Sequence, residues 1–400
     1  MSNAGTGDSR RWRVLAAGLV AMTAGCTFQY GLAYLIPSLL QHGLSLRQAS
    51  ILVACPTAGL LLTLVAWGAA ADRWGERLVL GTGLGLAGLV LLAATRAHGT
   101  APLAACLVLA GAAGASVYAA SGRLILGWFA AHERGLAMGI RQSAQPLGVA
   151  VAALALPSIG QHGQPAALTF LGGFCVTAAA LVAVAVRDPA RPEQRRGAPG
   201  RSPYHTPVLW RIHAASALLV VPQFAVGTFA LVFLVDQHGW QAPAAGRLLA
   251  VAQACGAAAR LGAGYWSDRA GSRMRPMRML AFGTALAVLL LAAGAAARSP
   301  LAVPALLAAA VVAVSTNGLA FTAVAEYAGS SWAGRALGIQ NTGQNALAAA
   351  TPPVLAVAIS VLGYGATFSA VALFPLAAAA FVPVSAERRA PQAPAAPAAG

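Results

Sequence analysis

The feature that most constrains this chain is a succession of apolar runs, each long enough to cross a lipid bilayer. A membrane-spanning helix needs about 20 apolar residues. Reading the runs between charges and prolines predicts twelve helices, at residues 14–40, 47–71, 78–95, 101–129, 136–158, 165–186, 208–235, 243–266, 276–297, 300–326, 335–361 and 363–384. Because only 9% of the 400 residues are charged, no sizeable soluble domain fits beside them. The sequence therefore predicts an all-α polytopic membrane protein.

The polar segments divide these helices into two sets of six. We expect an N-terminal tail at 1–13, a six-helix bundle at 14–186, a linker at 187–207, a second six-helix bundle at 208–384 and a disordered tail at 385–400. The linker is rich in proline and arginine, which favours a solvated segment.

All 26 basic residues are arginines, and their distribution predicts the orientation of the chain. If both termini lie on one side, that side carries 19 arginines and the opposite loops carry four. By the positive-inside rule, both termini and the linker are cytoplasmic and the protein is a multi-pass inner-membrane protein. Arginines spread between spans in this way do not indicate nucleic-acid binding.

An internal repeat relates the two sets of helices. A shift of 196 residues places Gln41-His42-Gly43 on Gln237-His238-Gly239 and Asp72-Arg73 on Asp268-Arg269. Because this shift is about half the chain, the repeat indicates a duplicated six-helix unit and two pseudo-symmetric bundles.

The repeat contains two copies of one loop motif, after the second and the eighth helix. Glycine allows tight turns and close packing, and the paired charges can form contacts that break when this side opens. We therefore assign a gating role to both copies: Gly68, Asp72, Arg73, Gly75 and Arg77, and Gly264, Asp268, Arg269, Gly271 and Arg273.

These loops resemble the signature G-x-x-x-D-R-x-G-R/K-R/K of the major facilitator superfamily, and the resemblance covers residues 14–384. The first copy departs from it at Glu76, where a basic residue is usual. The resemblance implies two six-helix bundles in the major facilitator fold, a central substrate site and rocker-switch alternating access.

Arg260 is the main candidate for substrate binding. It precedes Asp268 by eight residues, which places it about 12 Å along the helix from the membrane surface. A charge at this depth normally faces a partner or a watery cavity. Its role is either to bind an anion or to pair with a structural acid or reach the interface. The stretch 259–268 is similar to the eighth helix of the monocarboxylate transporters and oxalate–formate antiporters, and this resemblance implies a carboxylate ligand for Arg260.

Further candidates lie on three other helices. Each has a packing role as its alternative: an arginine near a helix end can reach the interface, and buried amides and aromatics often join helices. The candidates are Arg141 and Gln145 on the fifth helix, Asn341, Gln344 and Asn345 on the eleventh, and Gln29 and Tyr30 on the first.

Three charged residues near the cytoplasmic helix ends complete the predicted gate. We expect Arg123 to pair with a gating-loop acid such as Asp72, and Glu326 and Arg335 to form a network at the turn between the tenth and eleventh helices.

None of the ten acids lies at mid-membrane, which argues against a cationic-drug antiporter. The five cysteines lie in apolar runs without metal-ligand spacing, so we expect no metal site and no cofactor.

These features predict a secondary transporter of a small organic anion, a mono- or dicarboxylate, and no enzyme. We expect protons or a counter-anion to be coupled to transport. We also expect the protein to be a monomer in the lipid bilayer. The alternative is an exporter of a hydrophobic metabolite or drug with the same fold.

Overall fold

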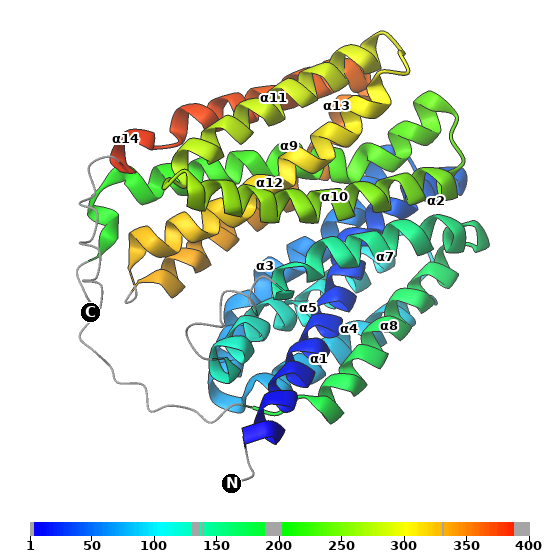
Figure 1. Ribbon diagram of the computed structural model, residues 1–400. Coiled ribbons are helices and arrows are strands. Elements are labelled where there is room, and N and C mark those ends of the chain that lie inside the picture. The colour runs from blue at the N-terminus through cyan, green and yellow to red at the C-terminus, as the bar shows by residue number, and fades with distance from the viewer. Residues whose placement is uncertain (1–3, 130–136, 138–139, 189–201, 330–331, 388–400) are drawn as a thin grey trace.

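The computed structural model describes residues 4–129, 137, 140–188, 202–329 and 332–387. The predicted all-helical fold is confirmed: in Figure 1 long helices form two bundles, one from each half of the chain. Within the described residues, ten helices are long and apolar enough to cross a membrane. One of these ten contains two of the predicted spans, because the helix at Ala333–Phe381 is interrupted at Gly363.

The N-terminal bundle contains the first six predicted spans. The first consists of α1 (Ala4–Gly31), the short η1 (Leu32–Leu35) and α2 (Ile36–Gln41). The others are α3 (Leu46–Trp74), α4 (Glu76–Ala94), α5 (Thr100–Trp128), α7 (Ala144–Ile159) and α8 (Gln164–Ala185), with η2 (Gly160–His162) before the last. Part of the predicted helix 136–158 lies outside the described residues.

The C-terminal bundle repeats this arrangement. A short η3 (Pro203–His205) precedes α9 (Pro207–His238), α10 (Ala242–Arg269), α11 (Met274–Ala296), α12 (Ala302–Ala328) and α13 (Ala333–Phe381), and α14 (Val384–Glu387) follows. Helix α10 is more polar than its neighbours and is absent from the ten apolar spans. That polarity matters because α10 carries Arg260.

Helix ends follow local sequence signals. At the start of α3 the Ser45 hydroxyl accepts a hydrogen bond from the Gln48 backbone N–H, and the Gln48 side chain accepts one from the Ser45 backbone N–H, at 2.9 Å. This reciprocal pair satisfies two backbone donors that a helix N-terminus leaves open. Proline occupies the first turn of α9 and α10, where its missing N–H costs nothing.

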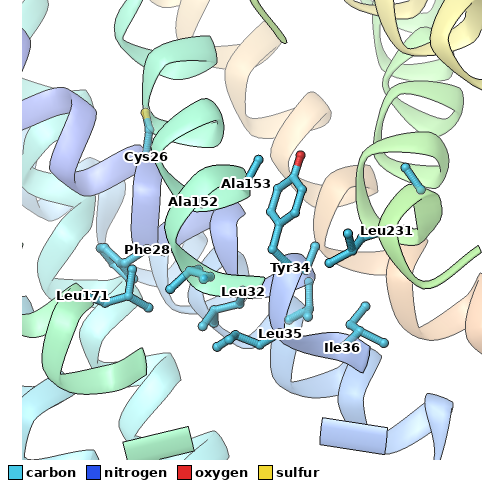
Figure 2. Packing of buried hydrophobic residues seen from close by; sticks show 14 of the residues in the cluster. Cys26, Phe28, Leu32, Tyr34, Leu35, Ile36, Ala152, Ala153, Leu171 and Leu231 are labelled. Carbon is cyan, nitrogen blue, oxygen red and sulfur yellow. The ribbon is translucent and has the colours of Figure 1, made fainter. Parts of the chain in front are cut away.

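The two bundles meet along α3 with α13 and α7 with α10. On the side opposite the chain termini, they share one buried core: residues of α9, α10 and α13 such as Phe229, Leu249 and Phe368 belong to the same cluster as Phe28 and Leu156. Figure 2 shows part of this cluster, with Tyr34 and Ala153 of the N-terminal bundle and Leu231 of the C-terminal one.

On the side of the termini, the C-terminal bundle has a core of its own. This second cluster joins the first turns of α9, α11 and α13 to the last turns of α10 and α12, with Leu209, Met277 and Val324 among its buried members. In Figure 1 the two bundles diverge toward this side. The protein is thus closed on the side opposite the termini in this conformation.

Gly246, near the start of α10, makes a very close contact between the bundles on the closed side. A Cβ at this position would overlap the Ala153 carbonyl oxygen of α7 and lie 2.9 Å from the Pro157 ring. Neither a backbone carbonyl nor a proline ring can shift without a large energetic cost. The close contact of α10 with α7 therefore requires that position 246 has no side chain.

We therefore expect Gly246→Val to disfavour the closed conformation by about 1–3 kcal/mol, the usual cost of overpacking. Spin labels at Gln41→Cys and Gln241→Cys, in a chain without its native cysteines, report the separation of the bundles there. The variant should populate longer distances in double electron–electron resonance.

Gly227→Val is the matched control, because a Cβ at Gly227 would meet nothing within 4 Å among the described residues. It should leave the distances unchanged. Identical distance distributions for Gly246→Val and the unsubstituted chain would contradict the assigned role of this contact.

Candidate functional site

Arg260 lies within the membrane-embedded part of α10, nine residues before the helix ends at Arg269, or about 13 Å along its axis. Its Nε donates to the Val314 carbonyl oxygen of α12 at 3.1 Å. Both terminal nitrogens point to the Gln145 side-chain oxygen of α7, Nη1 at 3.4 Å and Nη2 at 3.5 Å. Arg260 therefore reaches from the C-terminal bundle to the N-terminal one.

Arg141 lies four residues before Gln145, in the helical turn that leads into α7 at the end nearer the termini. A turn at Ser143 separates the two residues, because α7 begins at Ala144. The Arg141 Nε donates to the Ser121 hydroxyl of α5 at 2.9 Å, and Nη1 lies 3.5 Å from the Gln142 side-chain oxygen. Gln145 thus contacts Arg260, and both arginines lie within electrostatic range of Cys26 of α1.

Helix α1 contributes Tyr30 and Cys26 to the same region. Arg260 lies within electrostatic range of both, and Arg141 within range of Cys26. The Tyr30 ring packs edge-on against Phe224 of α9, with centroids 5.8 Å apart, and Cys26 Sγ lies 3.4 Å from the Tyr118 hydroxyl of α5. The group of Tyr30, Arg141, Gln145 and Arg260, which we call the central site, is partly exposed and spans both bundles.

The central site is suited to an anion. The hydrogen-bond partners of Arg260 are a carbonyl and an amide oxygen, both neutral, and among the described residues no carboxylate pairs with it. Guanidinium–carboxylate bonds are shorter, typically about 2.7–2.9 Å, and stronger than bonds to neutral acceptors. An anionic oxygen would therefore compete well with the Gln145 amide.

Three predicted amides lie elsewhere. Gln344 is buried and donates to the Ser216 hydroxyl of α9 at 2.6 Å, so in this conformation it joins α9 to α13. Asn341 and Asn345 donate to carbonyl oxygens of their own helix, at 3.1 and 2.9 Å. The hydrogen bonds of these side chains follow the packing alternative considered for them, and none joins the central site.

Gln29 is also buried inside the N-terminal bundle. Its Nε2 donates to the Thr57 hydroxyl of α3 at 3.2 Å, while its side-chain oxygen has no hydrogen-bond partner among the described residues. Gln29 therefore connects α1 to α3 rather than facing Arg260.

The second copy of the loop motif forms a connected network on the side of the termini. Arg273 binds Asp268 through Nη1 and Glu326 of α12 through Nη2, the latter at 3.1 Å. The Glu387 carboxylate accepts from the Arg273 backbone N–H at 2.6 Å. Thus two acids near α11 hold the side chain of Arg273 and one caps the helix N-terminus, where negative charge is favourable.

The first copy is capped in the same way. The Asp188 carboxylate, three residues beyond α8, accepts from the Arg77 backbone N–H at 2.7 Å, and the Arg77 side chain donates to the Ala183 carbonyl. Gly75 has φ of 93°, and a Cβ there would overlap the Asp188 carboxylate. Glycine at this position is thus needed for both the turn and the cap. Gly271 also has a positive φ, of 56°.

Other predicted gating residues differ in how they are held. Arg73 lies over Trp74 and Arg269 over Tyr265, with guanidinium-to-ring distances of 5.8 and 4.5 Å. A Cβ at Gly264 would meet nothing within 4 Å among the described residues, so the close helix approach expected there is not made in this conformation. Gly68 lies at the matching position of α3. The side chains of Asp72 and Arg123 lie outside the described part of the structure.

The expected Glu326–Arg335 network takes a different form. Glu326 binds Arg273, whereas the Arg335 guanidinium lies over the Trp332 ring at 4.8 Å. The two residues bracket a turn in sequence, but the loop-motif arginine of the neighbouring helix pair takes the carboxylate.

Two polar residues near the central site, Tyr118 and Ser121 of α5, were not among the candidates drawn from the sequence. Their spacing of three residues places them on one helix face, which is a usable signal. The capping acids Asp188 and Glu387 were also missed.

Among the described residues, no three His, Cys, Asp or Glu side chains gather closely enough to hold a metal ion.

Comparisons with known proteins agree with this architecture. The family model described as Major Facilitator Superfamily matches residues 15–352. The uncharacterized MFS-type transporter Rv2994 of Mycobacterium tuberculosis (strain ATCC 25618 / H37Rv) is 42% identical over 388 residues, which cover 96% of this chain and 87% of the relative.

Two solved structures share the fold at low sequence identity. A bacterial homolog to the human lysosomal transporter Spinster, in an inward-facing and occupied conformation, has a TM-score of 0.79 at 15% identity, and the match covers 96% of this chain and 99% of the other. The xylose transporter XylE from E. coli, in an inward open conformation, has a TM-score of 0.69 at 15% identity, covering 92% and 95%.

The family model and the relative both describe transporters, and the apolar helices agree with a multi-pass membrane protein. With the duplicated bundles and both loop motifs, they show that this chain belongs to the Major Facilitator Superfamily.

Proposed function

We propose that the protein is a secondary active transporter of a small organic anion, a mono- or dicarboxylate, with Arg260 as its principal ligand. The observation that carries this proposal is the guanidinium of Arg260, which lies between the two bundles and has only neutral hydrogen-bond partners among the described residues. A cation at membrane depth without a counter-charge is costly, and a bound anion offsets that cost.

The sequence around Arg260 also supports this substrate class. Residues 259–268 resemble the eighth helix of monocarboxylate transporters and oxalate–formate antiporters, in which the corresponding arginine binds the substrate carboxylate. None of the ten acids lies at mid-span. The sequence therefore offers no mid-span carboxylate of the kind that a cationic-drug antiporter uses, which favours an anion over a cation.

The way in which the bundles pack supports the proposed alternating access. They share one core on the closed side, while the C-terminal bundle keeps a separate core on the side of the termini. In the opposite conformation the Gly246 contact with α7 separates and the loop-motif helices close. An anion bound to Arg260 and to α7 would contact both bundles, so its binding energy would differ between conformations.

The geometry is compatible with two ways of balancing charge. Either the substrate brings its own proton, or it exchanges for another anion on the same arginine. Both keep the guanidinium charged throughout, as its high intrinsic pKa requires.

We infer further that the protein lies in the inner membrane with both termini in the cytoplasm. In the topology predicted from the sequence, 19 of the 26 arginines lie on that side. The closed side then faces outward.

Substitution of Arg260 tests the substrate site. In proteoliposomes we expect Arg260→Ala to abolish flux of a radiolabelled carboxylate such as lactate or succinate. Arg260→Lys should retain little, because an ammonium cannot offer two donors to a carboxylate in one plane. Loss of one charged hydrogen-bonded pair corresponds to about 10–150-fold in affinity.

Arg247→Gln is the matched control, because Arg247 is an exposed arginine of the same helix on the closed side. It should transport normally. Normal carboxylate flux in both Arg260 variants, or uptake that follows apolar compounds and ignores carboxylates, would contradict the proposed substrate class and favour export of a hydrophobic compound.

Reporter fusions test the proposed orientation. Alkaline phosphatase, which is active only outside the cytoplasm, should be inactive when fused after Ala386 and active when fused after Arg298, between α11 and α12. The reverse pattern would contradict the assigned orientation without affecting the fold.

A further inference from the structure

A buried histidine lies where the linker between the bundles meets the C-terminal bundle. His213 is in the second turn of α9, on the side of the termini, and is 9% exposed. Its Nε2 lies 2.9 Å from the Tyr204 hydroxyl of η3, and its Nδ1 lies 2.6 Å from the Gln340 side-chain oxygen of α13. His213 therefore joins three elements, η3, α9 and α13.

The hydrogen bonds of Gln340 determine which imidazole nitrogen carries the hydrogen. The Gln340 amide nitrogen donates to the Ser216 hydroxyl of α9 at 2.8 Å, while the amide oxygen faces Nδ1 of His213. Because an amide oxygen can only accept, Nδ1 is the donor in this pair. In the neutral ring Nε2 then has no hydrogen and accepts from the Tyr204 hydroxyl. The network thus fits one tautomer of a neutral histidine.

The surroundings of His213 also favour the neutral ring. Leu209 and Ile212, on the same helix, are buried in the apolar core on the side of the termini. The Tyr204 ring stacks on the imidazole with centroids 5.9 Å apart, and the Trp210 ring meets it edge-on at 6.3 Å. A positive charge at this place loses much of its hydration, which is costly unless a counter-charge is near.

Among the described residues, no carboxylate pairs with His213. The other titratable groups on the elements around this end of α9 are neither hydrogen-bond nor ion-pair partners of the imidazole. They are His205 of η3, Arg211 of α9, Asp268 and Arg269 of α10, Arg273, Arg275 and Arg278 of α11, Glu326 and Tyr327 of α12, Arg335 of α13 and Glu387 of α14. His205 and Arg211, the nearest in sequence, bind backbone carbonyl oxygens instead.

We propose that His213 is a pH-sensitive latch for the linker between the two bundles. The neutral imidazole binds Tyr204 and holds η3 on α9 and α13. Protonation places a hydrogen on Nε2, opposite the hydroxyl hydrogen of Tyr204, and leaves an imidazolium without a counter-charge. Histidine ordinarily changes its charge between about pH 5 and pH 8. The latch therefore holds above this range and releases as the pH falls through it.

Release of the latch lengthens the free chain between the bundles. While Tyr204 is bound, the linker reaches the C-terminal bundle at η3; after release it first reaches the bundle at Pro207, where α9 begins. A longer flexible linker restrains two bodies less. Acidification on the side of the termini would thus loosen the restraint on the relative motion of the bundles, whatever the substrate.

A spin label at His205→Cys, in a chain without its native cysteines, reports the mobility of η3 and removes the other histidine of that element. Electron paramagnetic resonance of the full chain in nanodiscs gives the ratio of mobile to immobile label. Between about pH 7.5 and about pH 5.5 we expect this ratio to rise. A rise of about 2–13-fold corresponds to the loss of one hydrogen bond.

His213→Gln should abolish this pH response, because an amide can bond to Tyr204 and Gln340 without titrating. Tyr204→Phe, which lacks the hydroxyl, should give the higher ratio at both pH values. His162→Gln, at an exposed histidine on the closed side, is the matched control and should keep the response of the labelled parent. Thermal unfolding of each variant reports whether it is folded.

The proposal fails if the ratio in the parent is equal at both pH values or decreases at the lower one. It also fails if His213→Gln keeps the pH response, or if Tyr204→Phe retains the low ratio of the parent. Because no substrate is present in these measurements, either result leaves the proposed carboxylate transport unaffected.

Discussion

The structure depends on one energetically costly feature, the guanidinium of Arg260, which lies at bilayer depth on α10. Arg260 helps to make its helix the most polar long helix of the C-terminal bundle, and its side chain is directed toward α7 of the other bundle instead of toward lipid. Its partners are neutral oxygens, so the charge is hydrogen-bonded without being neutralised. In the proposed function, this charge is the anion ligand between the two bundles.

The packing of the two bundles differs between the two sides of the protein. On one side small residues allow backbone contact across the interface, as at Gly246 and Ala153. On the other side the C-terminal bundle holds its loop motif by contacts of its own, with Arg273 bound by Asp268 and Glu326 and the α11 N-terminus capped by Glu387. Asp188 caps α4 in the same way, so the duplication extends to these capping acids.

The fold could be predicted from the sequence because hydrophobic length, repeat spacing and arginine placement are local or periodic signals. The same signals singled out Arg260, Arg141, Gln145 and Tyr30, of which the structure joins Gln145 to Arg260. They could not place Gln344, since a small rotation of α13 decides whether an amide faces Ser216 or the interface between bundles. Nor could they pair Arg273 with Glu326 or Glu387, because these contacts join residues 53 and 114 positions apart.

A structure of the protein with bromosuccinate bound tests the central claim most directly, since the anomalous signal of bromine locates the ligand. We expect a carboxylate within about 3 Å of the Arg260 terminal nitrogens, with the Gln145 side chain displaced from them. A ligand bound elsewhere at saturating concentration, with the contacts between Arg260 and Gln145 intact, would contradict the assignment of Arg260 as the anion ligand.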